Sequence, residues 1–149
     1  MLFLVIGIHS DKLVAQEVDS LTKQKYSNKY ITDASKIANS WLFCINDNQY
    51  ENAFLMLSHE VKAIYNKDSW ISLINQLMLE FGILEGRIAT EKIFKNKVEG
   101  MEDGFYVFID YKSNYSNTIN HSEHILLKQN KKKKWEIVDY NYEFRNKEK

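Results

Sequence analysis

The stretch that decides the fold is Phe105-Tyr106-Val107-Phe108-Ile109-Asp110-Tyr111. Val107 and Ile109 alternate with Tyr106 and Phe108, and this period of two predicts a β-strand with apolar side chains on both faces. The segment just before it, residues 99–104, contains two glycines and is typical of a turn. A strand needs partners, so we expect further strands on both sides of this stretch.

Working outward, the same period of two predicts three more strands. They cover residues 86–98, 122–129 and 135–142, and polar turns at 114–120 and 130–134 separate the later ones. Parallel strands need long crossover connections, whereas the connections here are short. The sequence therefore predicts an antiparallel meander of four strands.

Upstream of Gly82 the apolar period is helical and predicts three helices. The first begins near Thr32 as N-cap and ends at residues 46–48. The second covers residues 50–61, and the third begins at a cap on Asp68 or Ser69 and ends at Gly82. Helices first and strands second predict an α+β fold, with three N-terminal helices packed on one face of a curved four-stranded sheet. We expect the following core: Trp41, Ile45, Phe54, Leu57, Trp70, Ile74, Leu77 and Phe81 against Val107, Ile109, Ile125, Leu127 and Ile137.

The 149 residues suit one domain, which we place at residues 31–144. We interpret residues 1–30 as a signal remnant followed by a tether or frayed helix, and residues 145–149 as a disordered tail. The apolar run Leu2–Ile8 is too short to span a bilayer, which takes about 20 residues, but it fits the hydrophobic part of a signal peptide. We therefore expect an exported protein, periplasmic or secreted. The alternative is a cytoplasmic protein in which this run packs on the core.

Composition excludes several classes of function. Twenty basic and twenty acidic residues cancel, so no net field attracts nucleic acid or an anionic membrane. The single cysteine, Cys44, cannot form an internal disulfide. Because the sequence has no glycine-rich phosphate loop and no Gly-x-Ser-x-Gly motif, we expect no cofactor.

The order and spacing of several short signals resemble a bacterial family known as domain of unknown function 4019. The matching pieces are Trp41, Asp47, Tyr50, Trp70, Gly82, Arg87, the Gly100 to Tyr106 turn, Glu123, and residues 135–140. The resemblance covers about residues 32–142 and implies a small exported protein with a fold like nuclear transport factor 2 or cystatin. It implies no known activity. Glu99, Asp139 and the lysine run 131–134 depart from the family pattern and affect turns.

Arg87, Tyr115 and Glu123 form the main candidate site. In the expected register, Arg87 and Glu123 lie at the same end of the sheet, with Tyr115 on the strand between them. Arginine can hold a carboxylate in a two-pronged geometry across such a gap. One interpretation is a ligand-binding corner at the mouth of a pocket that includes Trp70. The alternative is a structural ion pair.

His121, Glu123 and His124 superficially resemble metal ligands. Residues three apart on a strand fall on opposite faces, so His121 and His124 cannot share a metal ion. We predict no metal site.

These observations favour a non-enzymatic accessory or ligand-binding protein, with an unknown small ligand or protein as partner. One alternative is a small pocket enzyme that uses Asp110, Glu123 or a histidine as acid or base. Another is a pure interaction module, if aromatic side chains fill the pocket.

The outer face of the sheet is unusually apolar in sequence. Period-two alternation directs Tyr106, Phe108 and Leu126 outward, and Val138 and Tyr140 as well if the last strand keeps its register. Such a patch predicts a weak homodimer through this face. The alternative is that residues 1–30 cover it.

Overall fold

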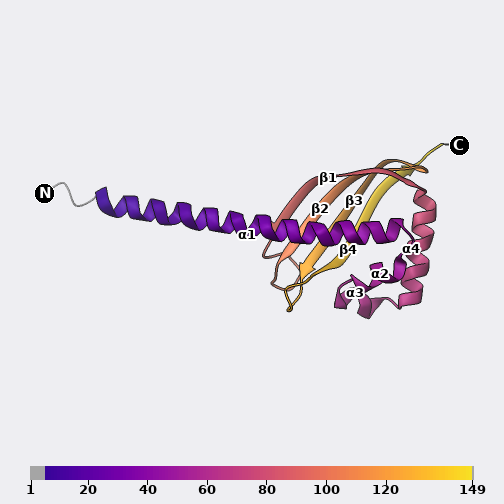
Figure 1. The fold of residues 1–149 in the computed structure, drawn as a ribbon, viewed down its shortest axis with the longest axis horizontal. Helices are drawn as coiled ribbons and strands as arrows, with labels where there is room; N and C mark the ends of the chain where they lie inside the picture. Colours follow the sequence, from indigo (N-terminus) through magenta and orange to yellow (C-terminus); the bar gives the residue numbers. More distant parts are fainter. Residues whose placement is uncertain (1–5, 149) are drawn as a thin grey trace.

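The computed structural model describes residues 6–148, with side chains from residue 20 onward, and has helices followed by a single antiparallel sheet (Figure 1). The strands pair in the order β1-β2-β3-β4, which confirms the α+β class and the meander. The elements are α1 (Ile6–Asn46), α2 (Tyr50–Leu55), α3 (His59–Ile64), α4 (Lys67–Phe81), β1 (Leu84–Lys95), β2 (Tyr106–Tyr115), β3 (Thr118–Gln129) and β4 (Trp135–Asn146). The start of the expected signal remnant, residues 1–5, and Lys149 of the expected tail lie outside the described residues.

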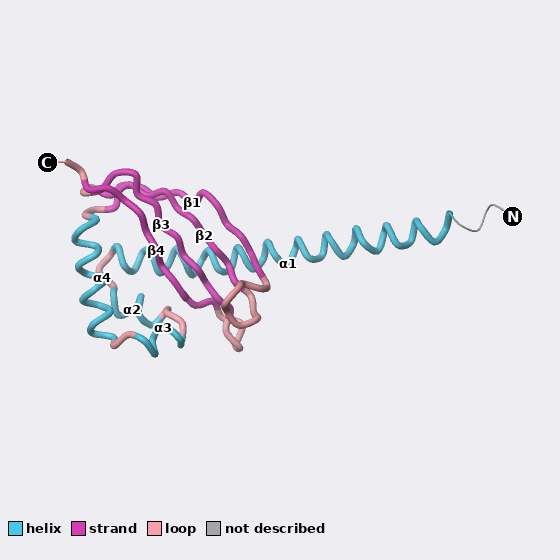
Figure 2. Tube along the Cα trace, turned by 180° about the vertical axis from the view of Figure 1, so that it is seen from behind, coloured by secondary structure: helices cyan, strands magenta, loops and turns pink. Residues whose placement is uncertain are grey.

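Helix α1 is much longer than the sequence predicted. It begins at Ile6 rather than near Thr32, because no glycine or proline interrupts the chain between Gly7 and its end at Asn46. Its first half projects away from the domain, while its second half crosses the sheet (Figures 1 and 2). No helix within residues 6–148 is long and apolar enough to cross a membrane.

The expected second helix is split in two, so residues 6–148 form four helices rather than three. Leu57 interrupts it by pairing in parallel with Ile137 of β4. The Ser58 amide donates to the Ile137 carbonyl at 2.7 Å, and the Ile137 amide donates to the Met56 carbonyl at 3.0 Å. The Ser58 side chain then caps α3. The prediction of one continuous helix was wrong because the backbone of Met56 and Ser58 forms hydrogen bonds with β4.

Helix α4 begins two or three residues earlier than predicted and ends where predicted. The Asn66 side chain, not Asp68 or Ser69, is the cap, and it accepts from the Asp68 amide at 2.9 Å. Gly82 ends the helix with a φ of 83°. A Cβ atom on Gly82 would lie 2.1 Å from Ser116 Oγ, so the position needs glycine for space as well as for conformation.

The strands are longer than expected at the end of the sheet near Gly82. β2 and β3 extend to Tyr115 and Thr118, so the predicted turn 114–120 shrinks to Ser116 and Asn117. β4 continues to Asn146, so the first two residues of the expected tail are strand.

The core is the predicted one with one exception. Leu77 is only half-buried, and the other predicted residues are buried. Trp41 of α1 lies at the centre and contacts the rings of Trp70 and Tyr140, with centroids 6.5 and 5.0 Å away.

A β-bulge in β4 changes which residues face the core. Leu127 lies opposite Ile137 but Leu126 lies opposite Asp139, so Val138 is an extra residue. An extra residue reverses the alternation beyond it, and Tyr140 therefore faces inward. The prediction that Tyr140 faces outward is wrong for this reason.

The outer face is also less apolar than predicted. Tyr106 is fully buried, because its hydroxyl donates to the Glu102 carbonyl at 2.6 Å and Lys128 lies over its ring. Phe108 and Leu126 are half-buried on this face. The homodimer stays a prediction, with a smaller patch to support it.

Candidate functional site

Arg87 of β1 and Glu123 of β3 form the predicted ion pair. Arg87 Nε donates to Glu123 Oε2 at 2.7 Å, and an Arg87 terminal nitrogen donates to Oε1 at 3.0 Å. β2 lies between them, and its Ser113 hydroxyl donates to the same Oε2 atom. The pairing is confirmed, and its two-pronged geometry is the strong form of such a contact.

Two tyrosines complete the shell around Glu123. The hydroxyls of Tyr115 and Tyr140 donate to Oε1 at 3.0 and 2.5 Å. Asn46, the last residue of α1, accepts from Arg87 at 3.0 Å and donates to the Tyr115 hydroxyl at 3.0 Å. We call these six residues, Asn46, Arg87, Ser113, Tyr115, Glu123 and Tyr140, the sealed centre.

The electrostatics of the sealed centre fix its charge state. Burial alone raises the pKa of Glu123, but the hydrogen bonds and positive charge of Arg87 outweigh it, with help from Ser113 and Tyr140, and hold this pKa below its ordinary value. Burial, together with the charge of Glu123, raises the pKa values of Tyr115 and Tyr140 far above normal. At neutral pH the centre therefore holds one carboxylate, one guanidinium and neutral phenols.

His121 and His124 lie on opposite faces, as predicted. His121 is buried beside the rings of Phe81 and Phe144, and its Nδ1 atom lies 2.8 Å from the Thr118 hydroxyl. His124 pairs with Asp110 on the outer face at 2.8 Å. Within the described residues, no three His, Cys, Asp or Glu side chains are placed to hold a metal ion.

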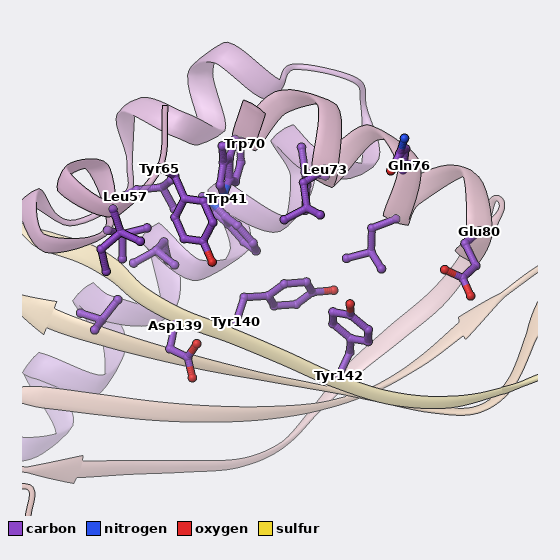
Figure 3. A pocket seen from close by; sticks show the side chains of 16 residues that line it. Trp41, Leu57, Tyr65, Trp70, Leu73, Gln76, Glu80, Asp139, Tyr140 and Tyr142 are labelled. Atoms are coloured by element: carbon purple, nitrogen blue, oxygen red, sulfur yellow. The ribbon is translucent and has the colours of Figure 1, made fainter. Parts of the chain in front are cut away.

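A groove of about 530 Å³ lies between the helices α3 and α4 and the strand β4 (Figure 3). Its lining is mostly apolar and aromatic. The lining residues are Trp41, Leu57, Val61, Ile64, Tyr65, Trp70, Leu73, Ile74, Gln76, Leu77, Glu80, Ile137, Val138, Asp139, Tyr140 and Tyr142. We call it the β4 groove.

The β4 groove is open to solvent along its helical wall. Ile64 and Leu73 are exposed by 76% and 56%, although both are large and apolar. Glu80 and Asp139 are its charged residues, and none of the lining residues is a lysine, arginine or histidine. The site thus combines an exposed apolar wall with negative charge.

The predicted site residues divide between these two places. Arg87, Tyr115 and Glu123 belong to the sealed centre, whereas Trp70 belongs to the β4 groove. Tyr140 joins them, since its ring lines the groove and its hydroxyl binds Glu123. The sequence did not indicate Tyr140 as a site residue, because the bulge at Val138 that turns it inward has no sequence signal of its own.

These features define a small α+β domain with a closed polar centre and an open apolar groove. The sequence model of the family described as "Protein of unknown function (DUF4019)" matches residues 37–140, more than half of the chain, and the chain belongs to this family. A comparison with curated proteins gives no match. The description of the family names no activity.

Proposed function

We propose that this protein is a non-enzymatic binding protein that holds the apolar part of a ligand in the β4 groove. The observation that carries the proposal is the exposure of Ile64, Tyr65, Leu73 and Tyr142 around a single concavity. Isolated apolar residues on a surface are ordinary, but a set that lines one groove marks a place where something binds. The groove's size falls within the range of ligand sites.

The chemistry of the acidic groups supports binding rather than catalysis. Every donor around Glu123 already points at its carboxylate, so the group has no proton to give and no free lone pair aimed at a substrate. Asp110 pairs with His124 on the outer face of the sheet, and neither residue lines the groove. A pocket enzyme needs several titratable groups that converge on one cavity.

The proposal includes export and a finer fold assignment. The apolar run Leu2–Ile8 supports a signal peptide and hence a periplasmic or secreted location. A helix lying across a curved antiparallel sheet, with a groove beside it, supports kinship with the folds of nuclear transport factor 2 and cystatin.

Leu73 and Leu79 offer a matched pair for the test. Both are exposed leucines of α4, but Leu73 lines the β4 groove and Leu79 does not. We expect the neutral dye Nile red to bind the protein and to bind Leu73→Ser about tenfold more weakly, since partial loss of a leucine contact is worth about 1.4 kcal/mol. Leu79→Ser should bind like the unchanged protein. Equal dye affinity in all three proteins, or no dye binding at all, would refute the proposal.

A further inference from the structure

We infer that the occupant of the β4 groove is an extended, positively charged peptide segment that pairs with the free edge of β4. This inference rests on the proposed function, because it concerns the same groove, and adds the chemical class of the ligand. Three separate observations carry it: the position of the groove along a strand edge, the use of that edge by Leu57, and the charge of the lining.

The β4 groove runs along the edge of β4 rather than over one face of the sheet. Four consecutive residues, Ile137 to Tyr140, line it. Successive side chains of a strand point to opposite faces, so even with the bulge at Val138 one face alone cannot present all four. β4 is the last strand of the sheet, and within residues 6–148 no other strand pairs with its outer edge.

The chain itself uses the start of this edge. Leu57 forms one parallel bridge with Ile137, through the hydrogen bonds of Met56 and Ser58 already described. Helix α3 then begins at His59 and leads the chain away. The edge from Asp139 onward remains without a partner among the described residues. Addition of a strand to such an edge is a common way to bind a peptide.

The charge of the β4 groove selects a cationic peptide. Glu80 and Asp139 form no ion pair with any Lys, Arg or His that the structure describes. Glu80 also lies in the last turn of α4, where the helix dipole disfavours negative charge and where there is no basic residue. Asp139 accepts a hydrogen bond from the Asn141 side chain at 2.6 Å, and it lies opposite Leu126 on the outer face of the sheet. A carboxylate without a countercharge on one side of the strand edge and an apolar wall on the other complement a segment in which basic and apolar side chains alternate.

The geometry of such a complex follows from the alternation of a strand. Side chains of one parity point toward the apolar wall around Trp70 and Leu73. Those of the other parity point to the outer face of the sheet, where the Asp139 side chain lies, directed away from the helices (Figure 3). The backbone supplies hydrogen bonds that do not depend on sequence. Affinity should therefore depend on charge, on apolar side chains and on backbone amides at the same time.

The test uses three octapeptides with the full chain, measured by calorimetry. The first alternates valine and lysine, the second alternates valine and glutamate, and the third is the lysine peptide with alternate backbone amides methylated on the strand-pairing side. We expect the lysine peptide to bind about tenfold or more tightly than either of the others. We also expect Asp139→Asn to weaken binding of the lysine peptide several-fold, with less salt dependence, because Asp139 lies on the side to which the lysines point. Glu91→Gln, which makes the same charge change on β1 at the opposite edge of the sheet, should have no effect.

The results that would refute the peptide ligand differ from the Nile red results that would refute ligand binding in the groove. Equal affinity for the lysine and glutamate peptides, or full affinity for the methylated peptide, would overturn the inference. The same conclusion follows if Nile red binding depends on Leu73 but no peptide binds, in which case the apolar groove stands and its peptide ligand does not. A dimer that Leu73→Ser dissociates would show that a second copy of the chain occupies the groove, and would also overturn it.

Discussion

The sealed centre and the β4 groove share one residue, Tyr140, and are opposite in every other respect. The sealed centre places charged groups inside the protein and satisfies each of them, with Glu123 accepting from Arg87, Ser113, Tyr115 and Tyr140. The β4 groove leaves apolar side chains exposed, and its two carboxylates form no ion pair with any Lys, Arg or His that the structure describes. The complete set of partners favours a structural role for the sealed centre, and the exposed apolar side chains support the proposed binding role of the β4 groove.

The comparison also shows that a shifted pKa can have a structural cause and does not by itself indicate a functional site. In the sealed centre the pKa of Glu123 is lowered and that of Tyr140 is raised well above its ordinary value, but both shifts come from burial and from fixed partners, as in any structural ion network. Substitutions in the sealed centre should therefore change stability, and substitutions in the β4 groove should change binding.

The largest effect is expected from Arg87→Met. Glu123 would keep its burial and lose its countercharge, and breaking a buried pair in this way costs about 3–5 kcal/mol. Urea unfolding should show this loss in the free energy of unfolding. Adding Glu123→Gln should recover part of it, because the uncompensated charge is gone. An unfolding midpoint unchanged by Arg87→Met would mean that the pair does not hold the sheet together.

Tyr140→Phe tests the residue that belongs to both regions. It removes one hydrogen bond to the buried carboxylate and keeps the ring, so stability should fall by about 1.5–3 kcal/mol. Nile red affinity should stay the same, since the aromatic surface of the groove is preserved. A change in dye affinity without a change in stability would reverse the roles assigned to the ring and the hydroxyl.

The pH dependence of stability should show a smaller effect, and it comes from His121. Burial lowers the pKa of this imidazole below its ordinary value of 6.5, with the charges of Glu123 and Arg87 acting in opposite directions. The unfolded chain therefore takes up a proton that the folded chain does not, and stability is lost as the pH falls below about 6.5. Glu123 has a lowered pKa, so its contribution is lost only as the pH falls below 4.5.

Two histidine variants separate these contributions. Urea titrations between pH 7 and pH 5.5 (roughly the histidine range) should show a decline that His121→Gln removes and His124→Gln keeps. An equal decline in both variants would place the sensitive group elsewhere.

The smallest effect concerns the outer face of the sheet. The patch around Phe108 and Leu126 predicts at most weak self-association, now that Tyr106 is covered and Tyr140 points inward. Sedimentation over a wide concentration range should show a dimer only at high concentration. Phe108→Ser should remove it and Leu73→Ser should not. A strict monomer that remains monomeric without residues 1–30 would refute the dimer.

The sequence predicted the features that depend on the spacing of apolar residues and on the local sterics of the backbone. The strand order, the core around Trp41 and the stop at Gly82 follow from alternation and from glycine's conformational freedom, and all were correct. The Arg87–Glu123 pair was predictable because the hairpins set its register. These features are local, or follow from local features in one step.

The sequence did not predict what depends on long-range pairing. Leu57 has helical periodicity and leaves the helix only because Ile137 offers it a partner. Val138 looks like an ordinary strand residue, yet as a bulge it reverses the direction of Tyr140 and so creates both the link to Glu123 and the groove floor. Thr32 looked like a helix start because a good cap residue does not reveal whether a helix already runs through it.

The helical wall of the β4 groove is anchored at both of its ends. At one end, Ser58 is hydrogen-bonded to Ile137, and at the other the Phe81 carbonyl accepts from the Asn117 amide at 3.0 Å. Because both ends are held, we expect the wall to open less freely than a lid that is hinged at one end. For the proposed ligand this predicts entry from the open side of the groove, and a limit on its thickness more than on its length. Selection by thickness favours a single flat strand over a helix, whose diameter with side chains is about 10–12 Å.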